Sequence, residues 1–214
     1  MTVETSETVV LLHGLGRSRL SLLPLQRHVQ AAGFQTLNFP YAPTLHRFDT
    51  IVNEFHDFLV SKVTTSRYHL VGHSLGNIII RARFRFDYPT TLARIVMLAP
   101  PNQPPALAAK LKRFPPFRLW AGDSGQKLGS ATFYADLPVP DVPFGVIAGS
   151  KGQRLTFKEP NDGIVTVEST RLEGMADHRV LPHTHTFMMN SPAVARETIH
   201  FLRHGIFDPT HCER

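Results

Sequence analysis

Cysteine is nearly absent from this sequence of 214 residues, because its one cysteine is Cys212, close to the C-terminal end. A single cysteine excludes an internal disulfide, and it excludes a zinc site that is built from several cysteines. It also suits a reducing compartment, where disulfides are rare.

Long apolar segments are absent as well. No stretch approaches the roughly 18 apolar residues that a membrane helix needs, so we expect no stable insertion into a membrane. The N-terminus, "MTVETSETVV", is acidic where a secretory signal peptide is basic, and its apolar run stops at Leu12. Together with the single cysteine, these features predict a cytoplasmic protein.

Acidic residues are fewer than basic ones, with 17 Asp and Glu against 23 Lys and Arg, so the formal net charge is +6. A basic balance of this size can favour nucleic acid or an acidic surface. The basic residues are dispersed, however, and no basic motif interleaved with aromatic residues is present. We therefore predict a solvated basic surface and no nucleic-acid partner.

Strand-like and helix-like stretches alternate along the chain. Short apolar runs predict strands at residues 8–14, 34–40, 68–72, 94–101, 143–149 and 178–182. Helices are predicted at 18–32, between 46 and 63, at 75–87, and from a cap at Ser191 to Gly205. This alternation is typical of an α/β domain with a mostly parallel sheet of about six strands flanked by helices.

Residues 101–142 break this rhythm, because the stretch is rich in proline and is predicted to be irregular. A connection of this length in a compact domain is usually a functional lid or a mobile loop. A surface insertion without a role is the alternative. We predict a single domain over residues 1–214 that carries a lid-like insertion at 101–142.

The segment "GHSLG" (72–76) has the pattern Gly-x-Ser-x-Gly where a predicted strand ends and a predicted helix begins. A serine on such a turn takes a strained backbone conformation that holds its hydroxyl clear of the sheet. The chain packs so closely around it that Gly72 and Gly76 must be small. The pattern predicts a nucleophile at Ser74, whereas His73 is expected to point away from it and to pack.

A nucleophile that attacks a carbonyl needs backbone donors for the oxyanion. One predicted donor is the N–H of Leu75, at the positive dipole end of the helix. The segment "LLHGLGRS" (11–18) offers another, because a His-Gly turn that leaves a buried strand presents its next amide, that of Leu15, to the same end of the sheet. The alternative is that these glycines only form a turn.

The acid of a Ser-His-acid triad is expected after the strand that follows the insertion, because the order in such folds is nucleophile, acid, histidine. "NDGIVTVEST" supplies Asp162 in an Asn-Asp-Gly turn. Asp141 precedes that strand and Asp177 lies too near the last one, while Glu159 stays possible. We favour Asp162.

The base is expected between the last strand and the last helix, where His183 and His185 lie. Residues two apart in an extended segment face the same side, so periodicity does not choose between them. A metal site would recruit His178 as well, but no carboxylate or cysteine completes a convincing ligand set nearby. We therefore predict no metal.

The segments "VVLLHGLGRS", "LVGHSLGN", "NDGIVTVEST" and "HTFMMNSPAV" together resemble the α/β-hydrolase superfamily, specifically its small lipase- and esterase-like branch. In that branch a small apolar patch follows the catalytic histidine, with a capping serine six positions on and an apolar helix residue at nine. Counted from His185, these positions hold Met188, Ser191 and Val194, whereas counting from His183 fits poorly. The resemblance thus favours His185 as the base.

The resemblance implies a minimal α/β-hydrolase fold and a carboxylic ester hydrolase that needs no cofactor. Its substrate would be a small-molecule or lipid-like ester, and residues 101–142 could form a mobile amphipathic cover. A thioesterase or acyltransferase with the same machinery is one alternative. A ligand-binding protein on the same fold is another. The oligomeric state is left open.

Overall fold

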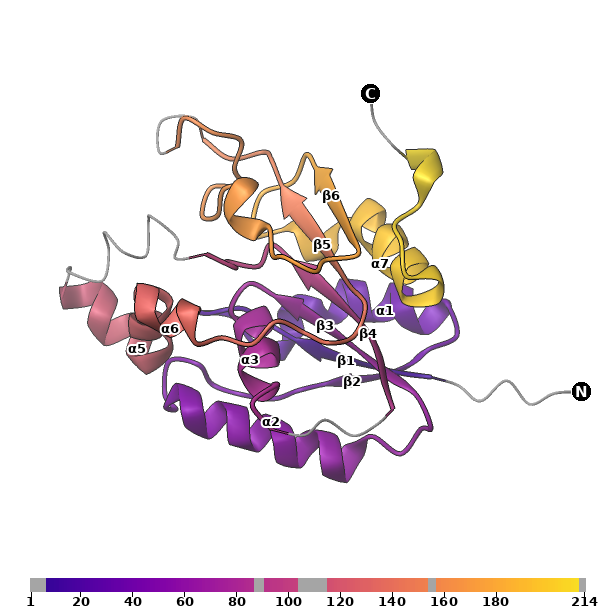
Figure 1. Ribbon diagram of the computed structural model, residues 1–214, viewed down its shortest axis with the longest axis horizontal. Coiled ribbons are helices and arrows are strands. Elements are labelled where there is room, and N and C mark those ends of the chain that lie inside the picture. The colour runs from indigo at the N-terminus through magenta and orange to yellow at the C-terminus, as the bar shows by residue number, and fades with distance from the viewer. Residues whose placement is uncertain (1–6, 87–90, 104–114, 154–156, 212–214) are drawn as a thin grey trace, which may run out of the picture.

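The computed structural model describes residues 7–86, 91–103, 115–153 and 157–211 (Figure 1). Cys212 and residues 104–114 of the predicted cover lie outside the described residues. Within the described ranges, no helix is both long and apolar enough to cross a membrane.

One parallel sheet of six strands forms the centre of the molecule, in the order β2-β1-β3-β4-β5-β6. The strands are β1 (Thr8–Leu12), β2 (Gln35–Asn38), β3 (Tyr68–His73), β4 (Leu92–Leu98), β5 (Phe144–Gly149) and β6 (Asp177–Leu181). The predicted parallel sheet of about six strands is therefore confirmed. Because all strands run the same way, the loops after them gather at one edge of the sheet.

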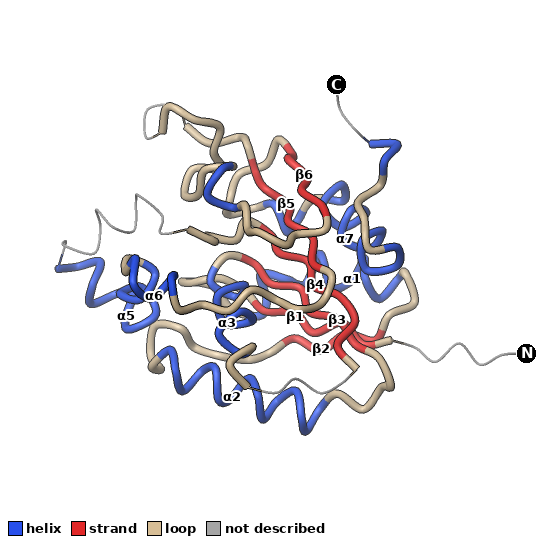
Figure 2. Tube along the Cα trace, viewed as in Figure 1, coloured by secondary structure: helices blue, strands red, loops and turns tan. Residues whose placement is uncertain are grey.

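Helices cover both faces of the sheet (Figure 2). One face carries α1 (Leu23–Ala31) and α7 (Pro192–His204), and the other carries α2 (Phe48–Lys62) and α3 (Leu75–Arg83). Alternate residues of β1 enter the two cores, with Val9 under α1 and α7 and Val10 under α2 and α3. This double burial explains why the strand is a continuous apolar run rather than an alternating one.

The predicted helix at the C-terminal end has the expected bounds. Ser191 Oγ accepts from the amides of Ala193 and Val194, and Gly205 ends the helix with φ of 80°. The prediction for 18–32 is only partly right, because a 3₁₀ turn over Arg19–Leu22 precedes α1. The helix predicted at 75–87 ends at Arg83.

The insertion is more regular than its prolines suggested. It holds α5 (Pro115–Leu128), which is kinked at Gly122, and α6 (Ala131–Ala135), which Ser130 caps. The expectation of an irregular stretch is therefore wrong for these residues. Two prolines open α5, where a missing N–H costs nothing because the first turn has no intrahelical acceptor for it.

Candidate active site

Ser74 lies between the end of β3 and the start of α3, with φ of 53° and ψ of −118°. Within the described residues, Ser74 and Ala99 are the two non-glycine residues with positive φ. Such a conformation costs roughly 1–3 kcal/mol and persists only when the surrounding structure imposes it. Here the Ser74 amide donates to Leu98 O at 2.9 Å, which ties the strained residue to the end of β4.

Three glycines make room for this turn. A Cβ on Gly72 would lie 2.4 Å from Asn77 Oδ1, and one on Gly76 would lie 2.5 Å from Leu12 O. A Cβ on Gly14 would come within 3.1 Å of the Ser74 Cβ. The end of β1 and the start of α3 therefore pack backbone to backbone beside the serine.

The two predicted oxyanion donors, the N–H groups of Leu15 and Leu75, have no acceptor within the part of the chain that the structure describes. Leu15 follows Gly14, which packs against Ser74, and Leu75 begins α3. The first N–H groups of a helix also carry its positive dipole end, which favours an anion at this position.

His13 fixes the turn that carries Leu15. Its ring is buried and stacks on Tyr41, with 4.1 Å between the ring centroids. Its Nδ1 and Nε2 lie 2.9 and 3.2 Å from Gly14 O and Tyr41 O, and the Tyr41 hydroxyl donates to His13 O. Burial lowers the pKa of His13, although the two carbonyl contacts oppose the shift. Sequence reasoning assigned no role to either ring.

Asp162 and His185 are in contact, and both are buried. His185 Nδ1 lies 2.7 Å from Asp162 Oδ2, and the His185 amide donates to Asp162 O at 2.9 Å. The other carboxylate oxygen of Asp162 accepts from the amides of Ile164 and Val165 at 2.9 and 2.7 Å. Asp162 is thus fixed by its own turn and presents one carboxylate oxygen to His185.

The competing carboxylates are engaged elsewhere or exposed. Asp177 accepts from the amides of His178 and Phe207. Glu159 and Asp141 are exposed at the surface. None of the three has a hydrogen bond to His185 within the part of the chain that the structure describes.

His183 faces the last helix instead of the acid. Its Nε2 lies 2.9 Å from Ser191 Oγ, the residue that caps α7. His178 Nε2 lies 3.0 Å from the Thr170 hydroxyl. Among the described residues, no three His, Cys, Asp or Glu side chains gather as metal ligands.

His73 does more than sequence reasoning expected of it. Its Nε2 lies 3.0 Å from the backbone oxygen of His185, and the two ring centroids are 4.9 Å apart. His73, the residue before Ser74, therefore links two segments. One is the turn at residues 72–76, which we call the elbow, and the other is the loop at residues 182–187 that carries His185, which we call the base loop. No hydrogen bond joins the Ser74 hydroxyl to His185 among the described residues, and in unliganded enzymes such bonds commonly tighten only when substrate binds.

Arg81 of α3 binds both ends of the insertion. Its buried guanidinium donates to Leu137 O and Pro138 O at one end, and to Asn102 O and Oδ1 at the other. Asn102 in turn donates to Thr170 O, which lies beyond the turn at residues 161–165 that carries Asp162 and that we call the acid turn. Burial lowers the pKa of Arg81 to about 10. The insertion is therefore anchored on the helix that follows Ser74.

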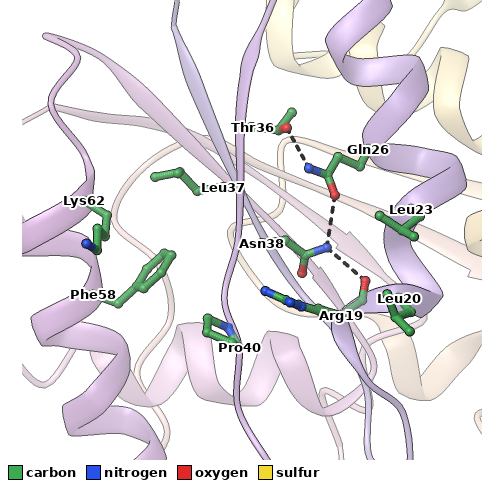
Figure 3. A pocket seen from close by; sticks show the side chains of 10 residues that line it. All are labelled: Arg19, Leu20, Leu23, Gln26, Thr36, Leu37, Asn38, Pro40, Phe58 and Lys62. Atoms are coloured by element: carbon green, nitrogen blue, oxygen red, sulfur yellow. Dashed lines mark hydrogen bonds between the residues drawn. The ribbon is translucent and has the colours of Figure 1, made fainter.

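A hollow of about 500 Å³ lies at the edge strand β2 (Figure 3). Thr36 and Asn38 point to Gln26 on one side of the strand, while Leu37 points to Phe58 on the other. Neither Ser74, Asp162 nor His185 lines this hollow, so it lies apart from the candidate active site.

Comparisons with known proteins agree with this architecture. A family model described as the alpha/beta hydrolase family matches residues 9–203. The mature form of lipase BlEst2 from Bacillus licheniformis has a TM-score of 0.70 and 14% identity, over 94% of this chain and 93% of that one. No curated protein matches the chain.

Two further solved structures have the same fold. Phospholipase PlaB from Legionella pneumophila, in complex with thio-NAD, has a TM-score of 0.70 and 17% identity, over 91% of this chain and 56% of that one. A carboxyl esterase of metagenomic origin has a TM-score of 0.68 and 18% identity, over 85% of this chain and 65% of that one. The chain thus spans little more than half the length of the phospholipase. At such identities the likeness is one of fold.

Proposed function

Because the chain belongs to the alpha/beta hydrolase family, we propose that it is a serine hydrolase that cleaves carboxylic esters through Ser74, His185 and Asp162. The observation that carries this proposal is the buried contact of 2.7 Å between His185 Nδ1 and Asp162 Oδ2, at the same edge of the sheet as the strained Ser74. An acid that accepts from Nδ1–H leaves the other ring nitrogen free to take a proton.

The reaction proceeds through an acyl-enzyme. His185 Nε2 takes the proton of the Ser74 hydroxyl while Ser74 Oγ attacks the ester carbonyl carbon, and the amides of Leu15 and Leu75 hold the oxyanion. The intermediate collapses as His185 returns the proton to the leaving alcohol. Water, deprotonated by His185, then attacks the acyl group, and the proton passes back to Ser74 as the acid leaves. No step requires a cofactor or a metal.

Asp162 stabilises this cycle in two ways. Its Oδ2 holds the proton on Nδ1, and its charge lies beside the imidazolium that forms in each half-reaction. The two amide donors to Oδ1 keep the carboxylate in place. The acid therefore orients and stabilises His185 without transferring a proton itself.

The proposed substrates are small-molecule or lipid-like esters. Support comes from the names of the similar structures, which include a lipase, a phospholipase and a carboxyl esterase. The insertion anchored by Arg81 is proposed as the cover of the site. A cytoplasmic location, the lack of a nucleic-acid partner and the single-domain organisation stay predictions from the sequence.

Covalent labelling with a fluorophosphonate tests the proposal. We expect the probe to attach to Ser74, as located by peptide mapping, and Ser74→Ala to abolish labelling. Ser150→Ala is the matched control, because Ser150 also follows a strand of the sheet but its hydroxyl donates to Leu181 O. Folded protein without label on Ser74 would contradict the proposal.

Paired substrates then separate ester hydrolysis from its alternatives. Oxygen esters and thioesters of the same acyl chain are compared, with and without an added alcohol. We expect faster turnover of the oxygen ester and release of free acid. Preferred thioester cleavage, or acyl transfer to the alcohol, would assign the same triad to a thioesterase or an acyltransferase.

A further inference from the structure

The backbone of His185 is held on both sides. Its amide donates to Asp162 O at 2.9 Å, and its carbonyl oxygen lies 3.0 Å from His73 Nε2. A carbonyl oxygen only accepts, so the hydrogen on this contact belongs to His73 Nε2. The base loop is therefore bonded to the acid turn through one backbone group and to the elbow through the other.

The surroundings of His73 suit it to act as a fixed, uncharged hydrogen-bond donor. Its side chain is 2% exposed, and its Nδ1 has no hydrogen-bond partner among the described residues. Burial lowers the pKa of His73 well below the usual value for histidine. The neighbouring rings of His185 and His13 and the charge of Arg17 lower it further, whereas the contact with the His185 carbonyl opposes the shift. A neutral ring does not repel the imidazolium that forms on His185 during the proposed reaction, whereas a protonated ring would.

The neighbouring chain leaves this ring little freedom. A Cβ on Gly14 would lie 3.0 Å from His73 Nδ1, so the turn that carries Leu15 packs against the edge of the ring. The opposite ring nitrogen faces the base loop. His73 thus lies between the segment that carries Leu15 and the segment that carries His185.

We propose that His73 is a positioning residue, whose Nε2–H holds the main chain of His185 so that the imidazole faces Ser74. This inference rests on the proposed function. In this proposal, His73 joins the elbow to the base loop through a hydrogen bond. Because a displacement of about 1 Å in a catalytic group can lower the rate roughly 100-fold, a single bond at this point has a large kinetic effect.

Position 73 needs a side chain whose hydrogen-bond donor lies about as far from the backbone as Nε2 of histidine. Glutamine places its amide nitrogen at about that distance from the backbone, whereas asparagine is shorter and leucine has no donor. His73→Gln should therefore restore what His73→Asn and His73→Leu lose. His69→Leu is the matched control, since His69 is a buried histidine on the same strand whose Nε2 contacts Glu7.

Steady-state kinetics on one ester give the first readout. We expect His73→Leu and His73→Asn to lower kcat about 10–100-fold and to leave KM within about twofold, because positioning acts on the transition state. His73→Gln should stay within about threefold of the original kcat, and His69→Leu should match it. Equal losses in the Gln, Asn and Leu variants would overturn the inference, because packing alone would then explain them.

Proton NMR of the histidine rings gives a readout that does not need turnover. The Nδ1–H of His185, bonded to Asp162, should give a downfield signal in the unmodified protein and in His73→Gln. In His73→Leu and His73→Asn it should shift or broaden as the base loop loosens. An unchanged signal in both would overturn the inference, whether or not any ester is cleaved. Turnover that depends on Ser74 but not on His73 would leave the proposed function standing.

Discussion

Asp162 holds His185 through two hydrogen bonds at once, one from the ring and one from the backbone. Oδ2 lies 2.7 Å from Nδ1, and Asp162 O accepts from the His185 amide at 2.9 Å. The backbone bond places the base loop beside the acid turn, and the side-chain bond then selects the tautomer. Asp162 thus determines both the position and the tautomer of His185. The position depends on the backbone oxygen of Asp162, whereas the tautomer depends on its carboxylate.

Asp162→Asn separates these two effects. The amide oxygen of asparagine can still accept from Ile164 and Val165, so its nitrogen faces His185 Nδ1. A donor at that point forces the proton to Nε2, where it blocks base catalysis. We expect kcat to fall by about 10³–10⁴-fold with little change in the melting temperature. Glu159→Gln, on an exposed carboxylate, is the control, and a larger loss in that variant would contradict the assignment of the acid.

Arg81→Met tests the anchoring of the insertion. The substitution leaves the acceptors on Asn102, Leu137 and Pro138 without their donor, while it relieves the desolvation of a buried charge. We expect a net loss of about 2–4 kcal/mol in the free energy of unfolding. Denaturant unfolding monitored by circular dichroism measures this loss. Arg85→Met is the control, because Arg85 is exposed and its side chain donates to Asp136 O; equal stability of the two variants would argue against an anchor.

Acid should destabilise the fold through buried and half-buried histidines. Burial, aided by Arg171, lowers the pKa of His178 to about 4, so the unfolded chain binds a proton that the folded chain rejects. The contribution of His178 to stability is therefore complete above its unfolded pKa of about 6.5 and is lost as pH falls toward 4. The lowered pKa values of His13, His69 and His73 act in the same direction.

His178→Gln should weaken this acid sensitivity, because an amide can still donate to Thr170 and does not titrate. The melting temperature, followed from pH 7 to pH 4, should fall less steeply in the variant than in the original protein. His28→Gln, on an exposed histidine of α1, should leave the slope unchanged. Parallel curves for His178→Gln and the original protein would contradict the proposed origin of the effect.

The parts of the fold that local sequence determines could be predicted. A buried parallel strand is a continuous apolar run, and a serine between two glycines at its end predicts a sharp turn, so the segment around Ser74 could be interpreted from a few residues. The Asn-Asp-Gly turn at Asp162 is also local, because the carboxylate of Asp162 accepts from the amides of its own turn.

Features that depend on distant partners were missed. His73 contacts a carbonyl 112 positions later in the chain, and nothing near it in sequence indicates that contact. The dispersed basic residues predicted a solvated surface, yet tertiary packing buries Arg81 against both ends of the insertion. The helices α5 and α6 were missed because proline density was taken as irregularity, although proline is compatible with a first helical turn.

The choice between His183 and His185 is the most direct test of the account. The measurement is kcat for a chromogenic ester in His185→Ala and His183→Ala, with Ser74→Ala as the baseline. We predict that His185→Ala falls to within about tenfold of that baseline, because loss of one triad member disables the others. His183→Ala should keep most of its activity, since its ring contacts the cap of α7. An active His185→Ala beside an inactive His183→Ala would contradict the account.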